Sequence, residues 1–229
     1  MLAPAAAHRR DRTTKSFTTV RRIGGLASIV TPHVNACIFR RSLPLVLEGA
    51  LRTSLAGLPG DFACHGHDAI SIASRFAHDA GLEAQASTLF CRDVHRLASA
   101  FSAALDRTDL SIRLDVISTD KCRRFHADYK HVRLLCTYVG PGTEWVEERD
   151  LDREALRHRD APDGSTFERT NARIVPDELA IYRANPGDVL LLKGESYPGN
   201  RGRGAVHRSP PIERSGHDVR RLVLTLDVG

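Results

Sequence analysis

Long apolar runs are missing from this chain of 229 residues, and so is any paired arrangement of cysteines. No apolar stretch approaches the roughly 20 residues that a helix needs to cross a bilayer, so we expect a soluble protein without a membrane partner. The cysteines are odd in number and widely spaced, which predicts reduced thiols in a cytoplasmic protein instead of a disulfide framework or a zinc knuckle. They are Cys37, Cys64, Cys91, Cys122 and Cys136.

Acidic residues are scarce at the start of the chain. Residues 1–41 contain eight Lys or Arg and a single acid, Asp11, so this segment carries a net charge of +7. The whole chain carries +5, which leaves −2 for the remainder. Because proteins hold nucleic acid mainly through Lys and Arg contacts with phosphate, nucleic acid is not an expected partner of this nearly neutral body. We expect residues 1–30 to be a flexible basic N-terminus, and their composition also fits an organellar transit peptide.

Helical periodicity follows this segment. Leucines four positions apart predict an amphipathic helix over residues 42–58. Asp68 is a favourable N-cap for a second helix over 68–81, and apolar residues on one face predict a third over 87–106. The part of the chain over residues 31–108 is therefore expected to be mainly helical.

After Thr108 the pattern changes from helical to strand-like. Residues 147–173 are charged and irregular, which indicates a long surface insertion. The other segments are short β-rich runs separated by glycine and proline turn signals. Strand-like runs occupy residues 112–116, 132–139, 189–192 and 222–226.

Short strands preceded by helices predict an α+β protein, a double-stranded β-helix (jelly roll) braced by N-terminal helices. We expect one domain over residues 31–229, in which the jelly-roll part over 109–229 carries the functional site. The sequence names neither the substrate nor the oligomeric state.

Three possible metal ligands and an arginine fall in the jelly-roll part. His126 and Asp128 are two positions apart, so on a strand their side chains point to the same side. His207 would arrive from a later strand, and alternation on the last strand places Arg221 on its polar side, opposite the leucines. Two histidines and one carboxylate on one face of a metal form the set that non-haem Fe(II) oxygenases use.

This pattern resembles the Fe(II)/2-oxoglutarate-dependent dioxygenases, whose motif runs His-x-Asp, a long gap, His, and then Arg on a following strand. The nearest resemblance is to the alkylation-repair group, through the segments 187–192 and 221–226. It implies that His126, Asp128 and His207 bind iron and that Arg221 holds the far carboxylate of 2-oxoglutarate. The repair enzymes have a second arginine where this chain has Asp227, which argues against nucleic-acid repair.

The chain as a whole resembles a bacterial group known only as domain-of-unknown-function family 1826. The segments 122–129, 133–145 and 193–211 carry this resemblance, which covers most of residues 30–228. The family implies no established activity.

Four further residues are candidates in the oxygenase interpretation. Tyr138 could donate to a co-substrate carboxylate, and Trp145, the only tryptophan, could wall the substrate side or simply cover core. The glycine-rich segment 193–204 is predicted to be a mobile flap, with Arg201 and Arg203 binding an anion on the substrate side.

Two other clusters of metal-ligating residue types remain. The segment Cys64-His65-Gly66-His67-Asp68 lacks partners at useful spacing, so a helix-capping turn is the better interpretation. Cys122 precedes the His-x-Asp motif closely enough to serve as a further ligand.

Three functional hypotheses follow from these patterns. The first is an Fe(II)/2-oxoglutarate-dependent dioxygenase acting on a small molecule or a side chain. The second is a cupin-like protein that uses the same ligands for zinc or manganese, in metal handling or hydrolysis. The third is a non-catalytic interaction domain with a structural polar interior.

Overall fold

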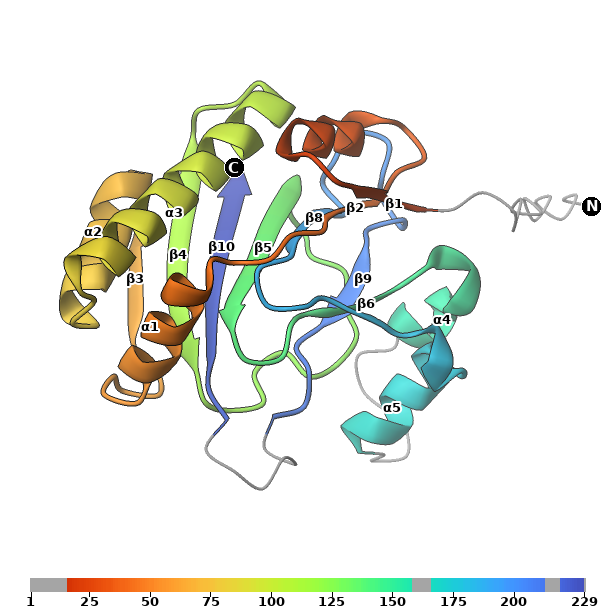
Figure 1. Cartoon of the computed structure of the whole chain (residues 1–229). Helices are drawn as coiled ribbons and strands as arrows, with labels where there is room; N and C mark the ends of the chain where they lie inside the picture. The colour runs from red at the N-terminus through yellow and green to blue at the C-terminus, as the bar shows by residue number, and fades with distance from the viewer. Residues whose placement is uncertain (1–15, 158–165, 213–218, 229) are drawn as a thin grey trace, which may run out of the picture.

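The computed structural model describes residues 16–157, 166–212 and 219–228. Two β-sheets and a layer of helices make up this part of the chain (Figure 1). The helices are the 3₁₀ segments η1 (Ile23–Val30), η2 (Glu148–Asp150) and η3 (Glu178–Ala180), and the α-helices α1 (Leu45–Leu55), α2 (Ala69–Asp79), α3 (Ala84–Leu105), α4 (Arg153–Arg157) and α5 (Phe167–Ile174). Among the described residues, none of these helices combines the length and apolar character needed to span a bilayer.

The large sheet has the order β1-β2-β8-β5-β10-β4-β3, and the small sheet has the order β7-β6-β9. All neighbouring strands are antiparallel except β1 and β2. The strands are β1 (Phe17–Val20), β2 (Ala36–Phe39), β3 (Ala63–Gly66), β4 (Leu110–Ile117), β5 (Val132–Val139), β6 (Glu144–Val146), β7 (Tyr182–Arg183), β8 (Val189–Lys193), β9 (Val206–Arg208) and β10 (Arg221–Val228).

From β4 onward the chain passes back and forth between the two sheets. It runs from β4 in the large sheet to a bridge at His126 in the small one, returns to β5, and crosses again to β6 and β7. It then continues through β8, β9 and β10, which lie in the large, small and large sheets in turn. This path is that of a double-stranded β-helix, so the predicted fold class is confirmed.

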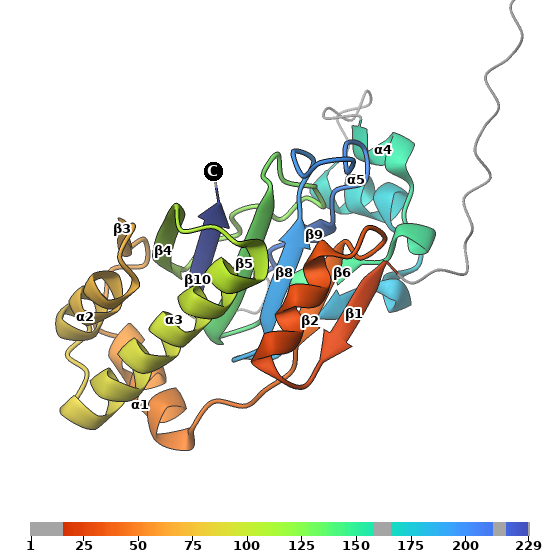
Figure 2. The same ribbon diagram turned by 90° about the horizontal axis from the view of Figure 1, so that it is seen from above.

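Side-chain alternation decides which face of the large sheet each residue serves. On β10, Leu222, Leu224 and Leu226 are fully buried against the helices, while Arg221 and Thr225 face the space between the sheets. Figure 2 shows α1, α2 and α3 along one face of this sheet, with α4 and α5 on the far side of the molecule. The hydrophobic effect at the helix-covered face leaves the other face available for polar residues.

All three predicted helices are confirmed, with ends shifted by a few residues. The leucines four positions apart form the buried stripe of α1, which starts after Pro44. The Asp68 carboxylate accepts a hydrogen bond from the Ser71 backbone at 2.7 Å and caps α2 as predicted. At the end of α3, Asp106 adopts the left-handed conformation with φ of 51° and stops the helix.

Two segments are more ordered, where the structure describes them, than the sequence suggested. Within the supposedly flexible residues 1–30, Leu26 and Ile29 are fully buried and β1 adds a strand to the large sheet; residues 1–15 lie outside the described residues. Within the insertion 147–173, α4 and α5 form, and α5 buries Asn171. The sequence suggested irregular structure there because apolar residues are few: Leu151, Ala155 and Leu156 pack against a small cluster that includes Ile174, which directly follows the segment.

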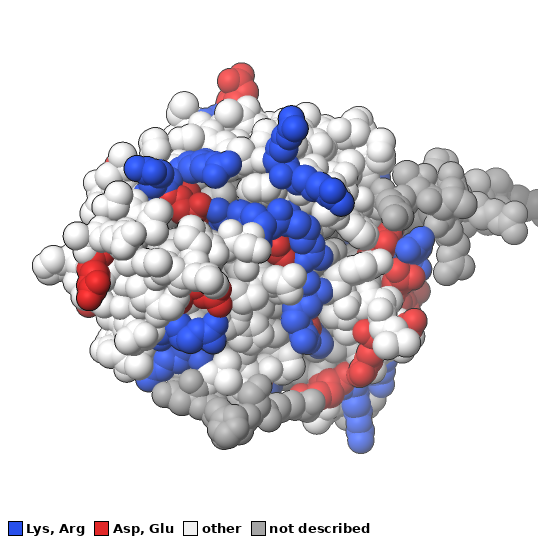
Figure 3. Space-filling view, viewed as in Figure 1, with Lys and Arg blue, Asp and Glu red and all other residues white. Residues whose placement is uncertain are grey.

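Charged side chains on the surface are largely intermixed. Figure 3 shows Lys and Arg side chains in a band across the middle of one face, with Asp and Glu side chains beside several of them. The exposed pair of Arg52 Nη2 and Glu48 Oε1, at 2.8 Å, is an example of such mixing on the protein surface.

Candidate metal centre

Backbone pairing brings the two histidines together. His126 and His207 form an isolated antiparallel bridge beside β9, with each N–H donating to the other's carbonyl at 3.0 Å. Their neighbours Phe125 and Val206 point the other way, into an apolar cluster beneath α4 and α5. Because alternate residues on paired strands face opposite sides, burial of Phe125 and Val206 directs both imidazoles into the space between the sheets.

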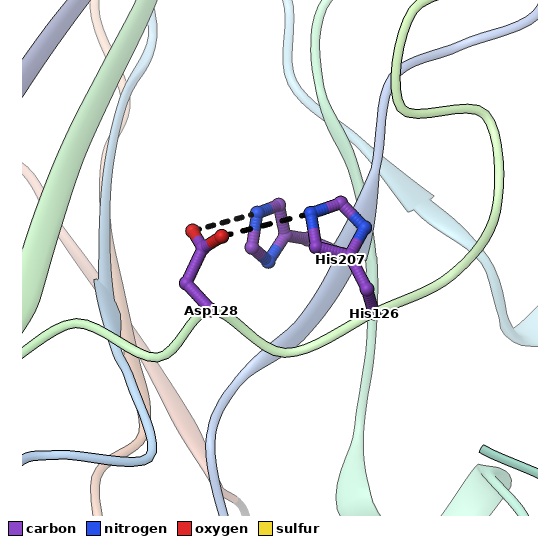
Figure 4. A group of neighbouring side chains, drawn as sticks. All are labelled: His126, Asp128 and His207. Atoms are coloured by element: carbon purple, nitrogen blue, oxygen red, sulfur yellow. Dashed lines mark ion pairs between the residues drawn. The ribbon is translucent and has the colours of Figure 1, made fainter. Parts of the chain in front are cut away.

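The Asp128 carboxylate faces both imidazoles from one side (Figure 4). Its Oδ2 is 3.4 Å from His207 Nε2, and its Oδ1 is 3.7 Å from His126 Nε2. One ligand atom from each of the three residues lies within 4.8 Å of the others. The predicted ligand residues therefore converge, and they form a group that could hold a metal ion.

A backbone carbonyl holds each imidazole at Nδ1, and Nε2 is turned toward the Asp128 carboxylate. His126 Nδ1 is 2.8 Å from the Arg124 carbonyl oxygen, and His207 Nδ1 is 3.1 Å from that of Ala205. A carbonyl only accepts hydrogen bonds, so in the neutral ring each Nδ1 carries the hydrogen and Nε2 keeps its lone pair. The same arrangement orients the metal-ligating histidines of known proteins.

The protonation states of the group also suit a metal. Burial and the neighbouring His207 lower the pKa of His126, which favours its neutral form. Burial alone would raise the pKa of Asp128, but the close contact with the His207 imidazole and the charge of Arg133 outweigh it and lower that pKa. A neutral imidazole beside an ionised carboxylate is the state in which both groups can donate electron pairs.

Arg133 of β5 contacts the carboxylate of this cluster directly. Its Nη1 donates to Asp128 Oδ2 at 2.7 Å, while its Nε and Nη2 donate to the two oxygens of Asp227 at 2.7 and 2.9 Å. Arg133 is not among the site residues predicted from the sequence. Strand alternation on β5, which places residues 133, 135 and 137 on the same side, could have indicated it.

A cavity of about 280 Å³ opens between the sheets beside the histidines. Arg221 lines it, only 2 % exposed, with Nε donating to the Pro141 carbonyl at 2.7 Å and Nη1 to Ser209 Oγ at 3.0 Å. Burial lowers the pKa of Arg221 to about 10, so the guanidinium is protonated at neutral pH. Other lining residues are Arg113, Asp115, Ile117, Lys121, Cys122, His126, Arg133, Leu135, Thr143, His207, Arg208, Val223 and Thr225.

This cavity is cationic and aliphatic. In the part of the chain that the structure describes, no carboxylate forms an ion pair with Arg221, whereas Arg208 is paired with Glu144 at 2.7 Å. A protonated guanidinium buried without a carboxylate partner is a strong attractor for an anion, because its charge is only partly compensated by neutral acceptors.

Tyr138 was wrongly predicted to face the co-substrate. It lies on the helix-facing side of β5, fully buried, and its hydroxyl donates to Asp93 Oδ2 at 2.8 Å. Strand alternation explains the error, because Tyr138 shares its side of β5 with Cys136, and that side packs against the helices.

Trp145 covers core, as the structural interpretation of this residue predicted, and does not line the cavity. It is 2 % exposed and stacks on Tyr182 with ring centroids 5.5 Å apart. Arg201 and Arg203 are exposed and likewise do not line the cavity. The substrate-side role suggested for these three residues is therefore not supported by their positions.

The remaining candidate ligands do not join a metal cluster within the described residues. Cys122 lines the cavity, but the group of possible ligands contains only the two histidines and Asp128. In the 64–68 segment, Cys64 is buried in the core and Asp68 caps α2, which confirms the helix-capping interpretation.

Fold and site together define a double-stranded β-helix with a His-x-Asp and a distal His gathered beside a cationic cavity. The chain belongs to the family of proteins of unknown function DUF1826, whose model matches residues 21–227. No curated protein gives a significant match to the sequence.

The solved structures with a similar course of the chain include dioxygenases and a hydroxylase. The rice dioxygenase for auxin oxidation has 12% identity and a TM-score of 0.47, with 90% of this chain and 76% of that one covered. The Arabidopsis thaliana dioxygenase for auxin oxidation 1, as its 2-oxoglutarate complex, has 8% identity and a TM-score of 0.48, with 93% and 92% covered. A Pseudomonas putida prolyl-4-hydroxylase has 12% identity and a TM-score of 0.45, with 90% and 97% covered. These identities and TM-scores are low, and no function of this chain follows from them.

Proposed function

We propose that this protein is an Fe(II)- and 2-oxoglutarate-dependent oxygenase that acts on a small molecule or an accessible side chain. One observation carries the proposal: the ligand atoms of His126, Asp128 and His207 lie within 4.8 Å of one another, and the histidines share a cavity with the buried Arg221.

The donor set fits a divalent iron ion. Imidazole nitrogens suit iron, zinc and copper, and a carboxylate adds the hard oxygen ligand of a two-histidine, one-carboxylate face. His126, Asp128 and His207 occupy one side of the site, so a bound ion would keep other coordination positions for further ligands. The Nδ1–H groups of both histidines are fixed on backbone carbonyls, which supports binding through Nε2.

Arg221 fits the far carboxylate of 2-oxoglutarate. A guanidinium matches a carboxylate with two parallel N–H groups, and the contacts with Pro141 and Ser209 hold its planar head in place. Thr137 adds a third acceptor, its Oγ1 lying 3.5 Å from Arg221 Nη2. Such a preorganised cation pays little entropy when a diacid binds.

The protein's part in the reaction is to bind and orient the reacting groups and to exclude water from them. When bound, Fe(II), 2-oxoglutarate and dioxygen supply the oxidising chemistry that hydroxylates a C–H bond and leaves succinate and carbon dioxide. The aliphatic side chains of Ile117, Leu135 and Val223 line the cavity and limit water around the reacting groups.

Anaerobic spectroscopy tests this proposal. Addition of Fe(II) and 2-oxoglutarate to the folded protein is expected to produce a weak visible charge-transfer band, which Fe(II) alone does not give. The His126→Ala variant should lack the band. A folded wild-type protein without the band would count against the oxygenase.

Zinc or manganese binding without oxygenase activity is the other outcome that the same ligands allow. Protein purified without added metal that retains zinc, and that forms no succinate from 2-oxoglutarate after loading with Fe(II), would favour that outcome.

A further inference from the structure

Arg133 is clamped between two carboxylates, one of which belongs to the candidate metal ligand. The guanidinium uses Nε and Nη2 for both oxygens of Asp227, and this bidentate pairing leaves Nη1 aimed at Asp128 Oδ2. All three side chains are between 15 and 18 % exposed, so water screens the contacts weakly. Strands β5 and β10 are hydrogen-bonded neighbours, and Asp227 pairs in register with Arg133.

The position of Arg133 poses an electrostatic conflict for a metal site. A guanidinium beside a ligand carboxylate competes with a divalent cation for the same negative charge. Asp227 offsets this competition, because its charge lies on the same guanidinium and the three groups together keep a net charge of −1 at neutral pH. Lys130, 3.9 Å from Asp227 and 45 % exposed, adds only a screened contact.

We propose that Arg133 and Asp227 form a positioning pair for the metal centre, in which Asp227 holds Arg133 and neutralises it, and Arg133 fixes one oxygen of Asp128. This inference rests on the metal site of the proposed function and assigns these residues a role within it. Arg133 is a positioning residue, since it acts through Asp128.

The arrangement also determines how Asp128 binds a metal. Arg133 already occupies Oδ2, so Oδ1 is the oxygen left for the cation, and the carboxylate acts as a single-oxygen ligand. A carboxylate that binds through one oxygen takes up one coordination position, which leaves the largest number open for a co-substrate.

A double-mutant cycle with Co(II) as the probe tests the pair without any need for catalysis. Co(II) dissociation constants and visible spectra are measured for wild type, Asp227→Asn, Arg133→Gln and the double variant, each checked for folding by circular dichroism. Loss of a residue that orients a ligand typically costs 10- to 100-fold in metal affinity. Asp227→Asn is expected to weaken Co(II) binding about tenfold or more in the wild-type background, because Arg133 then stands uncompensated beside the ion.

The coupling between Arg133 and Asp227 is the quantity that decides the test. In the Arg133→Gln background, Asp227→Asn is expected to change the dissociation constant by less than about twofold, since the charge that it compensated is gone. The matched control is Asp115→Asn, which removes a carboxylate lining the same cavity and paired with Arg113, yet contacts no ligand residue. Its Co(II) affinity and spectrum should stay at wild-type values.

Several outcomes overturn the inference. An Asp227→Asn protein that is folded and binds Co(II) as wild type does would give the pair a structural role only. An equal loss in both backgrounds would mean that Asp227 does not act through Arg133. Failure of the wild-type protein to bind Co(II), with His126→Ala as the reference for a destroyed site, would remove the metal centre itself and with it the proposed function.

Discussion

His126 and His207 exchange a pair of backbone hydrogen bonds at 3.0 Å, and their imidazole centroids lie 4.6 Å apart. This single bridge joins segments that are far apart in the sequence, and β9 carries His207 alongside Trp145 of β6. The position of the second histidine therefore depends on the packing of the small sheet.

Arg221→Met should abolish tight 2-oxoglutarate binding and leave the metal site intact. Truncating one partner of a buried charge pair costs about 2 to 5 kcal/mol, so affinity for 2-oxoglutarate is expected to fall at least about 30-fold. Anaerobic calorimetry on the Co(II)-loaded protein gives both affinities. Arg113→Gln, a cation at 54 % exposure that lines the same cavity, is the control and should bind 2-oxoglutarate nearly as wild type does. Equal losses in the two variants would contradict the assignment.

Tyr138→Phe is expected to lower the free energy of unfolding and to leave the affinity for 2-oxoglutarate unchanged. The variant removes the hydrogen bond to Asp93, a contact with a charged acceptor that contributes about 1.5 to 3 kcal/mol. Chemical denaturation measures the free energy of unfolding, and the calorimetric titration measures the dissociation constant of 2-oxoglutarate. Weaker 2-oxoglutarate binding with an unchanged free energy of unfolding would contradict this prediction and indicate that Tyr138 contacts the co-substrate.

Gly194→Ala should disturb the backbone that carries Asp128. A Cβ at this position would run into the Lys130 carbonyl oxygen and lie 2.7 Å from that of Asp128. We expect a loss of roughly 1 to 3 kcal/mol in unfolding free energy, together with weaker Co(II) binding. Gly49→Ala is the matched control: it lies in α1 with no atom within 4 Å of the added Cβ, so helix propensity should make it more stable by about 1 kcal/mol.

Titration of Lys193 should make the free energy of unfolding rise with pH above about pH 8. Burial, with a smaller effect of Arg203, lowers the pKa of Lys193 to about 8, below its ordinary value of 10.5. Between these values the unfolded chain binds more protons than the folded one, so the free energy of unfolding rises with pH, by up to about 1.4 kcal/mol per pH unit. As pH falls from 10.5 to about 8 this gain is progressively lost, and below that pH Lys193 is protonated in both states and adds no further pH dependence.

Two buried thiols oppose this trend at higher pH. Burial raises the pKa of Cys37 and of Cys136 to about 12, so their stabilising effect declines as pH rises above the ordinary thiol value of 9. The window between about pH 8 and 9 therefore isolates Lys193. Urea titrations of wild type and Lys193→Met across this window should show a steeper rise for wild type; parallel curves would contradict the prediction.

Sequence patterns were sufficient to predict those features that follow from a single physical rule. Leucine spacing located α1, and the alternation of residues 221–226 placed leucines toward the helices and Arg221 toward the cavity. The two-residue spacing of His126 and Asp128 correctly predicted that their side chains point to the same side, although only His126 takes part in a β-bridge.

Other features depend on contacts that a sequence does not display. The ion pair of Arg133 with Asp227 joins two neighbouring strands, and no pattern in the sequence links the two residues. Tyr138 was misplaced because a polar hydroxyl suggested the cavity, while its hydrogen-bond partner Asp93 comes from α3. Residues 16–30 look like part of a basic tail, yet Leu26 and Ile29 bury themselves in the core.

Elemental analysis tests the central claim most directly. Wild-type protein, incubated with Fe(II) under anaerobic conditions and desalted, is expected to retain about one equivalent of divalent metal, and His126→Ala and Asp128→Ala to retain background amounts while remaining folded. Background metal in folded wild-type protein, or equal metal in all three proteins, would contradict the account.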